Sequence, residues 1–289
     1  MTVEVLAHAR AAMVMFSISF PSAFLRRLPL WAGALAAALL FTLTAAQAQE
    51  PVRPILDNLN YSDPQAIEQR ADLFMVRKFY PEAAQLYERL TRMDPKNAAY
   101  FNKLGIAHHQ NQNLRGARDA YRRAMRVRPN YPEPVNNLAA VEYARKNYRA
   151  AIMNYLKALQ LSPRDAVVYS NLGTAYFAYE KYDYAMNCYR YALQIDPKIF
   201  ERTGRTGTIV HQRDVKDLAA FNFYMAKTHA SMGQIEESLQ YLQKAYESGF
   251  KDLRRQLEDK AFAALAADPR FVEFVAMLDQ EALQKAAER

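Results

Sequence analysis

Apolar residues recur at intervals of three and four along residues 166–197, in two runs separated by a short turn at residues 180–182. This spacing places the apolar side chains of each run on one face of a helix. Pro197 cannot continue the second helix and marks its end. The pattern predicts two antiparallel helices, which approach most closely at the small residues Gly173 and Ala185. A single pair cannot bury both of its apolar faces, so we expect neighbouring pairs.

The same pattern repeats every 34 residues across the middle of the chain. Three series of residues carry this period: Pro95, Pro129, Pro163 and Pro197; Ala83, Ala117, Ala151 and Ala185; and Tyr87, Tyr121, Tyr155 and Tyr189. Chance very rarely produces three coincident series. We therefore predict four stacked helical pairs, or repeats, at residues 64–97, 98–131, 132–165 and 166–199.

This arrangement resembles the tetratricopeptide repeat family, whose helical pair contains an aromatic residue, Leu-Gly, Tyr, Ala, a second aromatic residue, Ala and Pro. In residues 166–199 these positions hold Tyr169, Leu172-Gly173, Tyr176, Ala185, Tyr189, Ala192 and Pro197. The resemblance implies an all-α fold, a right-handed α-solenoid of antiparallel helix pairs whose first helices line a concave groove. Other repeats depart from the pattern at Arg70, His108 and Glu142, where Leu, Tyr and Tyr are usual.

Three further segments follow the four repeats. Residues 200–218 break the period, and their glycines and β-branched residues predict an inserted loop with a short extended segment. This loop either carries function or only connects repeats. Residues 219–250 resemble a fifth, degenerate repeat with Gly233 at its turn. Residues 251–289 resemble the ending of many bacterial tetratricopeptide proteins, which implies C-terminal helices that cap the last repeat.

The amino terminus has the parts of a secretory signal peptide. Arg26 and Arg27 precede the uncharged run Leu28–Ala46, and Ala46-Gln47-Ala48 supplies the small residues of a cleavage site. Residues 1–48 are therefore predicted to be removed, which makes the protein periplasmic or secreted. The alternative is an N-terminal membrane anchor in the inner membrane with the repeats facing the periplasm, since about 20 apolar residues span a bilayer. Residues 49–63 are predicted to be a linker.

Composition adds two constraints to this picture. The net charge of +8 becomes +6 without residues 1–48, because these contain three arginines and one glutamate. Such a modest excess indicates solubility rather than nucleic-acid binding, and we expect no nucleic-acid partner for an exported protein. The single cysteine, Cys188, excludes an internal disulfide.

The sequence lacks the motifs of common enzymes. It contains no glycine-rich phosphate loop, nucleophile elbow, H-E-x-x-H motif or paired-cysteine zinc spacing. Cys188 has no histidine nearby in sequence, and the adjacent His108 and His109 point to different sides of a helix. We expect packing roles for Cys188 and His108. Neither enzymatic activity nor a metal or cofactor is predicted.

The resemblance implies that a peptide or partner helix binds along the first helices. The predicted peptide-binding groove residues are Asn102, Lys103, His109, Asn136, Asn137, Tyr143, Ser170, Asn171, Thr174 and Phe177. Asn137 and Asn171 share one repeat position, and asparagine amides there could pair with a peptide backbone, which resembles the asparagine ladder of sugar-transferase tetratricopeptide arrays. Alternatively, these asparagines pack between helices. Lys103 alone is too little positive charge for a clamp that binds the carboxylates of chaperone tails.

A basic face follows the second helix of repeat two. Its residues Arg115, Arg118, Arg122 and Arg126 are three or four positions apart, which puts them on one side of the helix. This basic face could attract anionic lipid head groups or wall polymers. Alternatively, it is ordinary solvated charge.

Two functional hypotheses follow from these patterns. The first is a non-enzymatic scaffold in the cell envelope that binds another protein in the groove. The second is an envelope-associated protein that attaches to an anionic membrane or wall polymer through the basic face. Charge-driven attachment weakens steeply as ionic strength rises, whereas peptide binding in the groove does not.

Overall fold

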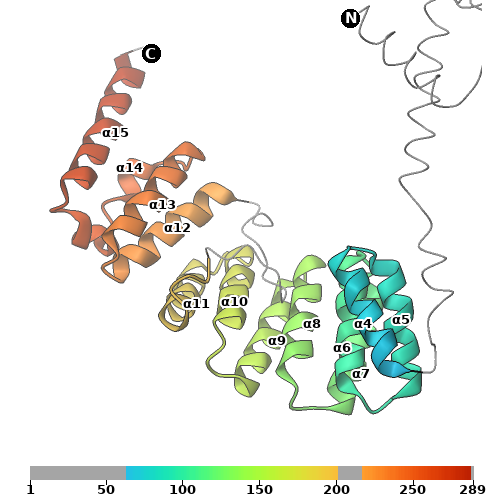
Figure 1. Cartoon of the computed structure of the whole chain (residues 1–289). Helices are drawn as coiled ribbons and strands as arrows, with labels where there is room; N and C mark the ends of the chain where they lie inside the picture. Colours follow the sequence, from blue (N-terminus) through green and yellow to red (C-terminus); the bar gives the residue numbers. More distant parts are fainter. Residues whose placement is uncertain (1–62, 201–216, 288–289) are drawn as a thin grey trace, which may run out of the picture. The chain divides into compact units, whose positions relative to one another are not determined.

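The computed structural model describes residues 63–200 and 217–287, which belong to one compact unit spanning residues 61–289 (Figure 1). The predicted signal peptide or anchor at residues 1–48 and nearly all of the linker lie outside the described residues. The same holds for residues 201–216, which contain the predicted extended segment. Among the helices that are described, none has both the length and the apolarity to cross a membrane.

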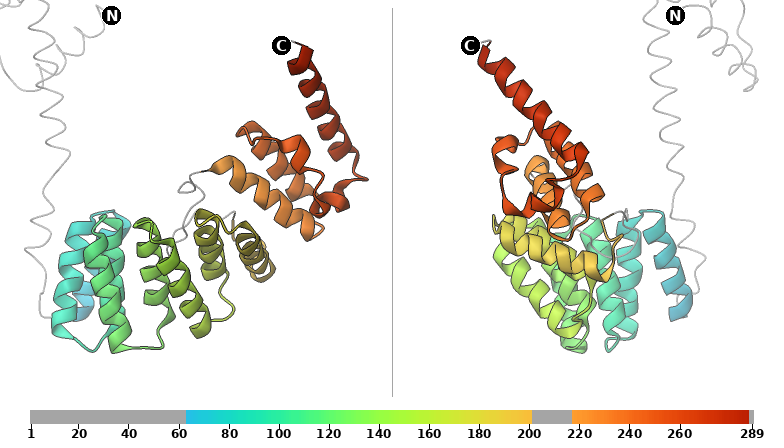
Figure 2. Two further views of the ribbon diagram at one scale, coloured as in Figure 1. Left: turned by 180° about the vertical axis from the view of Figure 1, so that it is seen from behind. Right: turned by 90° about the vertical axis from the view of Figure 1, so that its left-hand side faces the viewer.

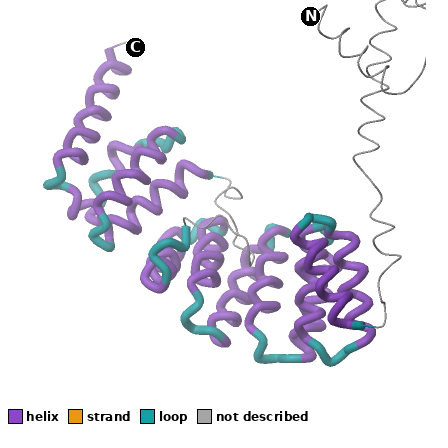
Figure 3. The backbone as a smooth tube through the Cα atoms, in the orientation of Figure 1, coloured by secondary structure: helices purple, strands orange, loops and turns teal. Residues whose placement is uncertain are grey.

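Consecutive helices form four pairs between residues 64 and 195. The pairs are α4 (Pro64–Val76) with α5 (Tyr80–Met93), α6 (Ala98–Gln110) with α7 (Leu114–Val127), α8 (Pro132–Ala144) with α9 (Tyr148–Leu161), and α10 (Ala166–Ala178) with α11 (Tyr182–Ile195). Neighbouring helices lie side by side in both views of Figure 2, and short turns join them in Figure 3. The two described ranges contain no strand. The predicted all-α fold of stacked helix pairs is confirmed.

Polar side chains and prolines define where the first helices begin. Asp63, Asn97 and Asp165 precede α4, α6 and α10, and each side chain accepts a hydrogen bond from a backbone N–H two residues later, at 2.9, 3.1 and 2.9 Å. These bonds satisfy N–H groups that have no partner within the helix. α8 begins instead at Pro132, which has no N–H to satisfy.

The turn inside each pair contains one residue with a left-handed backbone. Lys78, Gln112, Lys146 and Glu180 have φ angles of 64°, 59°, 62° and 59°. For a residue other than glycine this conformation costs about 1–2 kcal/mol. The packing of the two helices must therefore hold the turn in place. In the fifth pair Gly233, with φ of 72°, takes this role without a steric cost.

A tyrosine from each second helix fills the space inside its pair. All members of the series are buried: Tyr87, Tyr121, Tyr155 and Tyr189. The first helix offers a small residue at the contact, and a Cβ atom on Gly105 would lie 2.4 Å from Cε1 of Tyr121. A Cβ atom on Gly173 would lie 2.5 Å from the same atom of Tyr189. The tyrosines thus occupy equivalent surroundings, as the 34-residue period predicts.

A fifth helix pair and three C-terminal helices of different length complete the described part of the chain. α12 (Leu218–Ser231) pairs with α13 (Ile235–Glu247), and α14 (Leu253–Gln256), the 3-10 helix η2 (Lys260–Leu265) and α15 (Pro269–Ala287) follow. Their shared core includes Phe223, Leu242, Phe262 and Phe271. The C-terminal helices therefore cover apolar surface that α12 and α13 would otherwise expose to water.

The hydrogen bonding of the buried tyrosines leads to a stability prediction. The hydroxyl groups of Tyr121 and Tyr155 have no hydrogen-bond partner among the described residues, whereas Tyr87 donates to Asp72. We expect Tyr155→Phe to preserve the free energy of unfolding or raise it by about 1 kcal/mol, because it removes an unsatisfied buried group. Tyr87→Phe should lower it by about 1.5 kcal/mol, because a bond to a carboxylate is lost. Urea denaturation measures both, and a larger loss for Tyr155→Phe would contradict this assignment.

Candidate binding surfaces

Most of the predicted groove residues are buried. The buried members are Asn102, Asn136, Asn137, Ser170, Asn171, Thr174 and Phe177. Lys103, His109 and Tyr143 are half-buried and keep contact with solvent. The first helices therefore use most of these side chains to pack on their neighbours, and the accessible part of the predicted surface lies on α6 and α8.

The four asparagines form a chain of hydrogen bonds across α6, α8 and α10. Asn137 donates from Nδ2 to Oδ1 of Asn102 at 3.1 Å, and Asn171 donates to Oδ1 of Asn136 at 3.2 Å. Asn136 donates to Oδ1 of Asn137 at 3.3 Å and joins the two bonds into one chain. The two bonds between helices connect residues 35 positions apart, one more than the 34-residue period. They therefore link adjacent repeat positions rather than equivalent ones.

These bonds agree with the helix-packing alternative for the asparagines. Asn171 is 0% exposed, and the other three amides are between 5% and 8% exposed. A buried amide is costly unless it is hydrogen-bonded, and the chain of bonds meets that requirement. A peptide lying on the first helices would not reach Asn171 without displacing its neighbours.

The repeat-four end of the predicted groove is covered by α12. The ring of Phe177 lies with its centroid 5.9 Å from that of Phe221 and 6.0 Å from that of Tyr224, both on α12. Beneath it, the hydroxyl of Thr174 donates to the carbonyl of Ser170 at 3.1 Å. The fifth pair therefore covers Phe177, while Asn171 and Thr174 are buried against Asn136 and Tyr189 of the first four pairs.

A cluster of charges joins α4 to α6 on the accessible part. Nζ of Lys103 donates to Glu68 at 2.7 Å and to both carboxylate oxygens of Asp72 at 2.9 Å. Partial burial alone lowers the pKa of Lys103, but the hydrogen bonds to Glu68 and Asp72 outweigh this and raise the pKa. The lysine therefore stays protonated, and the cluster presents charges of both signs.

The aromatic part of this surface lies on α6 and α8. Burial lowers the pKa of His109, so its imidazole is neutral at pH 7. The ring of Tyr143 lies 5.4 Å from that of Tyr148 in a tilted arrangement. Both residues combine an apolar body with polar atoms, a combination that is common where proteins bind one another.

Glu142 shows how repeat three accommodates a departure from the family pattern. Its carboxylate is 6% exposed and accepts hydrogen bonds at 3.2 Å from Arg145 and from Asn147. These partners lie at the turn between α8 and α9. The carboxylate thus replaces the packing of a tyrosine with hydrogen bonds to the turn.

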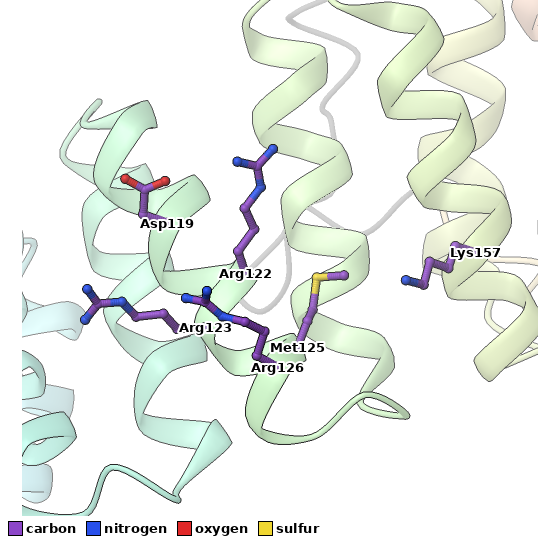
Figure 4. Close-up of a pocket in the computed structure, with 6 residues that line it drawn as sticks. All are labelled: Asp119, Arg122, Arg123, Met125, Arg126 and Lys157. Carbon is purple, nitrogen blue, oxygen red and sulfur yellow. The ribbon is translucent and has the colours of Figure 1, made fainter.

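The basic face lies on α7 and borders a pocket. Arg115, Arg122 and Arg126 are exposed, and Arg118 is half-buried with Nε 3.7 Å from Oδ1 of Asp119. The pocket has a volume of about 590 Å³ and is lined by Asp119, Arg122, Arg123, Met125, Arg126 and Lys157 (Figure 4). Arg123 and Lys157 are not among the residues of the predicted basic face. They are 34 residues apart and so hold the same repeat position, and this spacing is the sequence signal that could have placed both side chains on the same side of the array.

In the described residues, Cys188 is not activated as a nucleophile and the possible metal ligands do not form a metal site. Burial raises the pKa of Cys188 to about 12, which keeps its thiol protonated at neutral pH. Across residues 63–200 and 217–287, no three side chains of His, Cys, Asp or Glu come together in a way that could hold a metal ion.

Helix pairs stacked at a constant step define this chain as an α-helical repeat protein. The tetratricopeptide repeat pattern matches residues 69–132, 140–179 and 166–199. The protein is therefore a tetratricopeptide repeat protein, and its helical array is an α-solenoid of that family. No curated protein sequence matches the chain.

Several solved structures are similar to this chain. PilF of Pseudomonas aeruginosa is 18% identical, with 78% of this chain and 97% of that chain covered and a TM-score of 0.48. MamA from Desulfovibrio magneticus is 16% identical, with 68% and 97% covered and a TM-score of 0.47. YrrB, described as a TPR protein with an unusual peptide-binding site, is 16% identical, with 71% and 95% covered and a TM-score of 0.44.

The chain of asparagines generates a second prediction. Asn171→Ala should lower the free energy of unfolding by about 1–3 kcal/mol, because it leaves the buried Oδ1 of Asn136 without its donor. Asn187→Ala is the matched control, because Asn187 is exposed on α11 and its loss should change stability by at most about 0.5 kcal/mol. Urea denaturation of both variants tests this. Equal stabilities would show that the amide chain does not hold the first helices together.

The histidines of α6 generate a third prediction. Burial lowers the folded-state pKa of His108 and His109 below the ordinary value. Between about pH 7.5 and pH 5.5 the unfolded state then binds more protons, so the free energy of unfolding should fall as the pH falls. His109→Gln should reduce this fall. Urea denaturation at the two pH values measures it, and a variant with the wild-type pH dependence would exclude a contribution from His109.

Proposed function

We propose that this protein is a non-enzymatic scaffold of the cell envelope that binds another protein along the first helices of its tetratricopeptide array. The proposal is carried by one observation, namely that Lys103, His109 and Tyr143 remain half-exposed on α6 and α8 while the other predicted groove residues are buried. These three side chains supply a charge, a polar ring and an aromatic anchor. Of the three, tyrosine is the residue type that is enriched where proteins bind one another.

The neighbourhood of these residues defines the chemistry of the partner. Glu68 and Asp72 stand beside Lys103, and their two negative charges exceed its single positive charge. A strongly anionic tail therefore gains little here, and a segment with an apolar side chain next to Tyr143 and a polar group beside Lys103 fits better. The asparagine amides bond to one another, so the partner is recognised through its side chains rather than through a ladder of backbone contacts.

Export belongs to the same proposal. Its support is the sequence of residues 26–48, with two arginines, an apolar run and a small-residue cleavage site. In this proposal the repeats work in the periplasm or outside the cell, after cleavage or on a membrane anchor. The non-enzymatic part is supported by the buried, protonated Cys188 and by the family, whose repeats typically bind proteins.

The basic face favours a second candidate function, attachment to an anionic membrane or wall polymer. The specific observation is that two of its arginines, Arg122 and Arg126, line a pocket. This face lies on second helices, so attachment there leaves the proposed protein-binding surface on the first helices unoccupied.

Site-specific photocrosslinking tests the proposed protein-binding surface. Tyr143 is replaced by p-benzoylphenylalanine in the full chain, which keeps an aromatic ring at the site, and the protein is irradiated in envelope extract. We expect one discrete crosslinked partner, identified by mass spectrometry, and loss of that product when Lys103→Ala and His109→Ala are added. The matched control carries the same replacement at Tyr184, which is 61% exposed on the second helix α11.

The outcomes of this experiment are distinct. A partner that crosslinks from position 143 and not from position 184 supports binding on the first helices. Equal crosslinking from both positions, or none from position 143, would refute the proposed surface. Retention of the product in the Lys103→Ala, His109→Ala variant would show that these residues do not contribute.

A further inference from the structure

The pocket beside the basic face concentrates positive charge from two repeats. Arg122, Arg123 and Arg126 project from α7 and Lys157 from α9, and Figure 4 shows the amino group of Lys157 on the side that faces the α7 residues. Asp119 is the single carboxylate in the lining. Four cations and one anion leave a net charge of +3 around the pocket.

These four cations have no anionic partner in the described part of the chain. Arg122, Arg123, Arg126 and Lys157 make no ion pair or side-chain hydrogen bond there, whereas cations elsewhere do. The carboxylate of Asp119 lies 3.7 Å from Arg118, which draws part of its charge away from the pocket. Like charges around one pocket repel one another, and a bound anion would relieve that repulsion.

The cluster arises from the stacking of repeats two and three. Arg123 and Lys157 are 34 residues apart, so they hold one repeat position on neighbouring second helices. In repeat four that position holds Tyr191, and the position of Arg126 holds Gln160 in repeat three. In repeat one the positions of Arg122, Arg123 and Arg126 hold Glu88, Arg89 and Arg92, and Glu88 pairs with Arg92 at 3.7 Å. The junction of repeats two and three therefore differs from that of repeats one and two in having an arginine, Arg122, where repeat one has a carboxylate.

We propose that this pocket binds a phosphoryl group, held by Arg122 and Arg126 from α7 and by Lys157 from α9. Guanidinium groups donate paired hydrogen bonds that match phosphate oxygens, and a lysine adds a mobile point charge. A volume of about 590 Å³ is in the range of small-ligand sites and exceeds what one phosphate fills. The ligand is a soluble phosphate ester or a phospholipid head group, and both present the same chemistry.

The inference uses the same basic face as the second candidate function and is independent of the proposed protein partner. Two probes separate the sources of the phosphoryl group. Isothermal titration calorimetry with pyrophosphate reports a soluble ligand, and co-sedimentation with vesicles of phosphatidylglycerol and phosphatidylcholine reports a head group. Vesicles of phosphatidylcholine alone serve as the blank. Both measurements use the full chain at low ionic strength.

The decisive comparison is between two double variants that remove the same charge. Arg126→Gln with Lys157→Gln removes two cations from the pocket, whereas Arg149→Gln with Arg164→Gln removes two exposed cations that belong neither to the pocket nor to the basic face. We expect the pocket variant to weaken binding about tenfold or more, since hydrogen bonds to a charged group are lost, while the control stays within about twofold. All four positions are exposed, so circular dichroism should show both variants folded.

Each outcome decides the inference. Selective weakening by the pocket variant, with either probe, supports the site. Binding of pyrophosphate without binding of vesicles supports the pocket and removes the membrane as the source. Equal weakening by both double variants would show delocalised surface charge and overturn the site, as would failure of the wild-type protein to bind either probe.

Discussion

In each of the first four pairs a tyrosine ring packs between the two helices, and this is the contact on which the array depends. The ring excludes water along much of the pair and sets how closely the helices approach, which is why Gly105 and Gly173 have no room for a Cβ atom. The left-handed turn residues, such as Lys78 and Glu180, persist because this packing outweighs their steric cost. Repetition of one contact at a constant step produces the stacked array.

Polar contacts then join one repeat to the next. The asparagine chain links α6, α8 and α10, and the Lys103 cluster links α4 to α6. Both sets occupy the first helices, the surface on which we propose that a partner binds. An asparagine that is buried in these bonds is no longer available to a ligand, whereas Lys103 keeps contact with solvent. The accessible part of this surface is therefore limited to the few residues that these contacts leave exposed.

The second helices are under a different constraint. Their outward positions do not pack on the next pair, so their composition can change from one repeat to another without loss of the core. In repeat two those positions carry arginines, in repeat three Met153 and Leu156 are exposed, and in repeat four Tyr184 and Tyr191 are. One scaffold thus presents chemically different surfaces on one side while its interior stays regular.

The sequence alone predicted the helical pairs, their 34-residue step and the burial of Tyr121, Tyr155 and Tyr189, because these features depend on local periodicity and on contacts that recur at one spacing. It also placed Lys103, His109 and Tyr143 on the first helices. Only the tertiary structure decided that Asn171 and Phe177 are buried and that Lys157 joins the arginines of α7 around a pocket. The reason is geometric. The exposure of a side chain at the edge of a helix face depends on the rotation and distance of the neighbouring helix, and the residue spacing within one repeat does not determine either quantity.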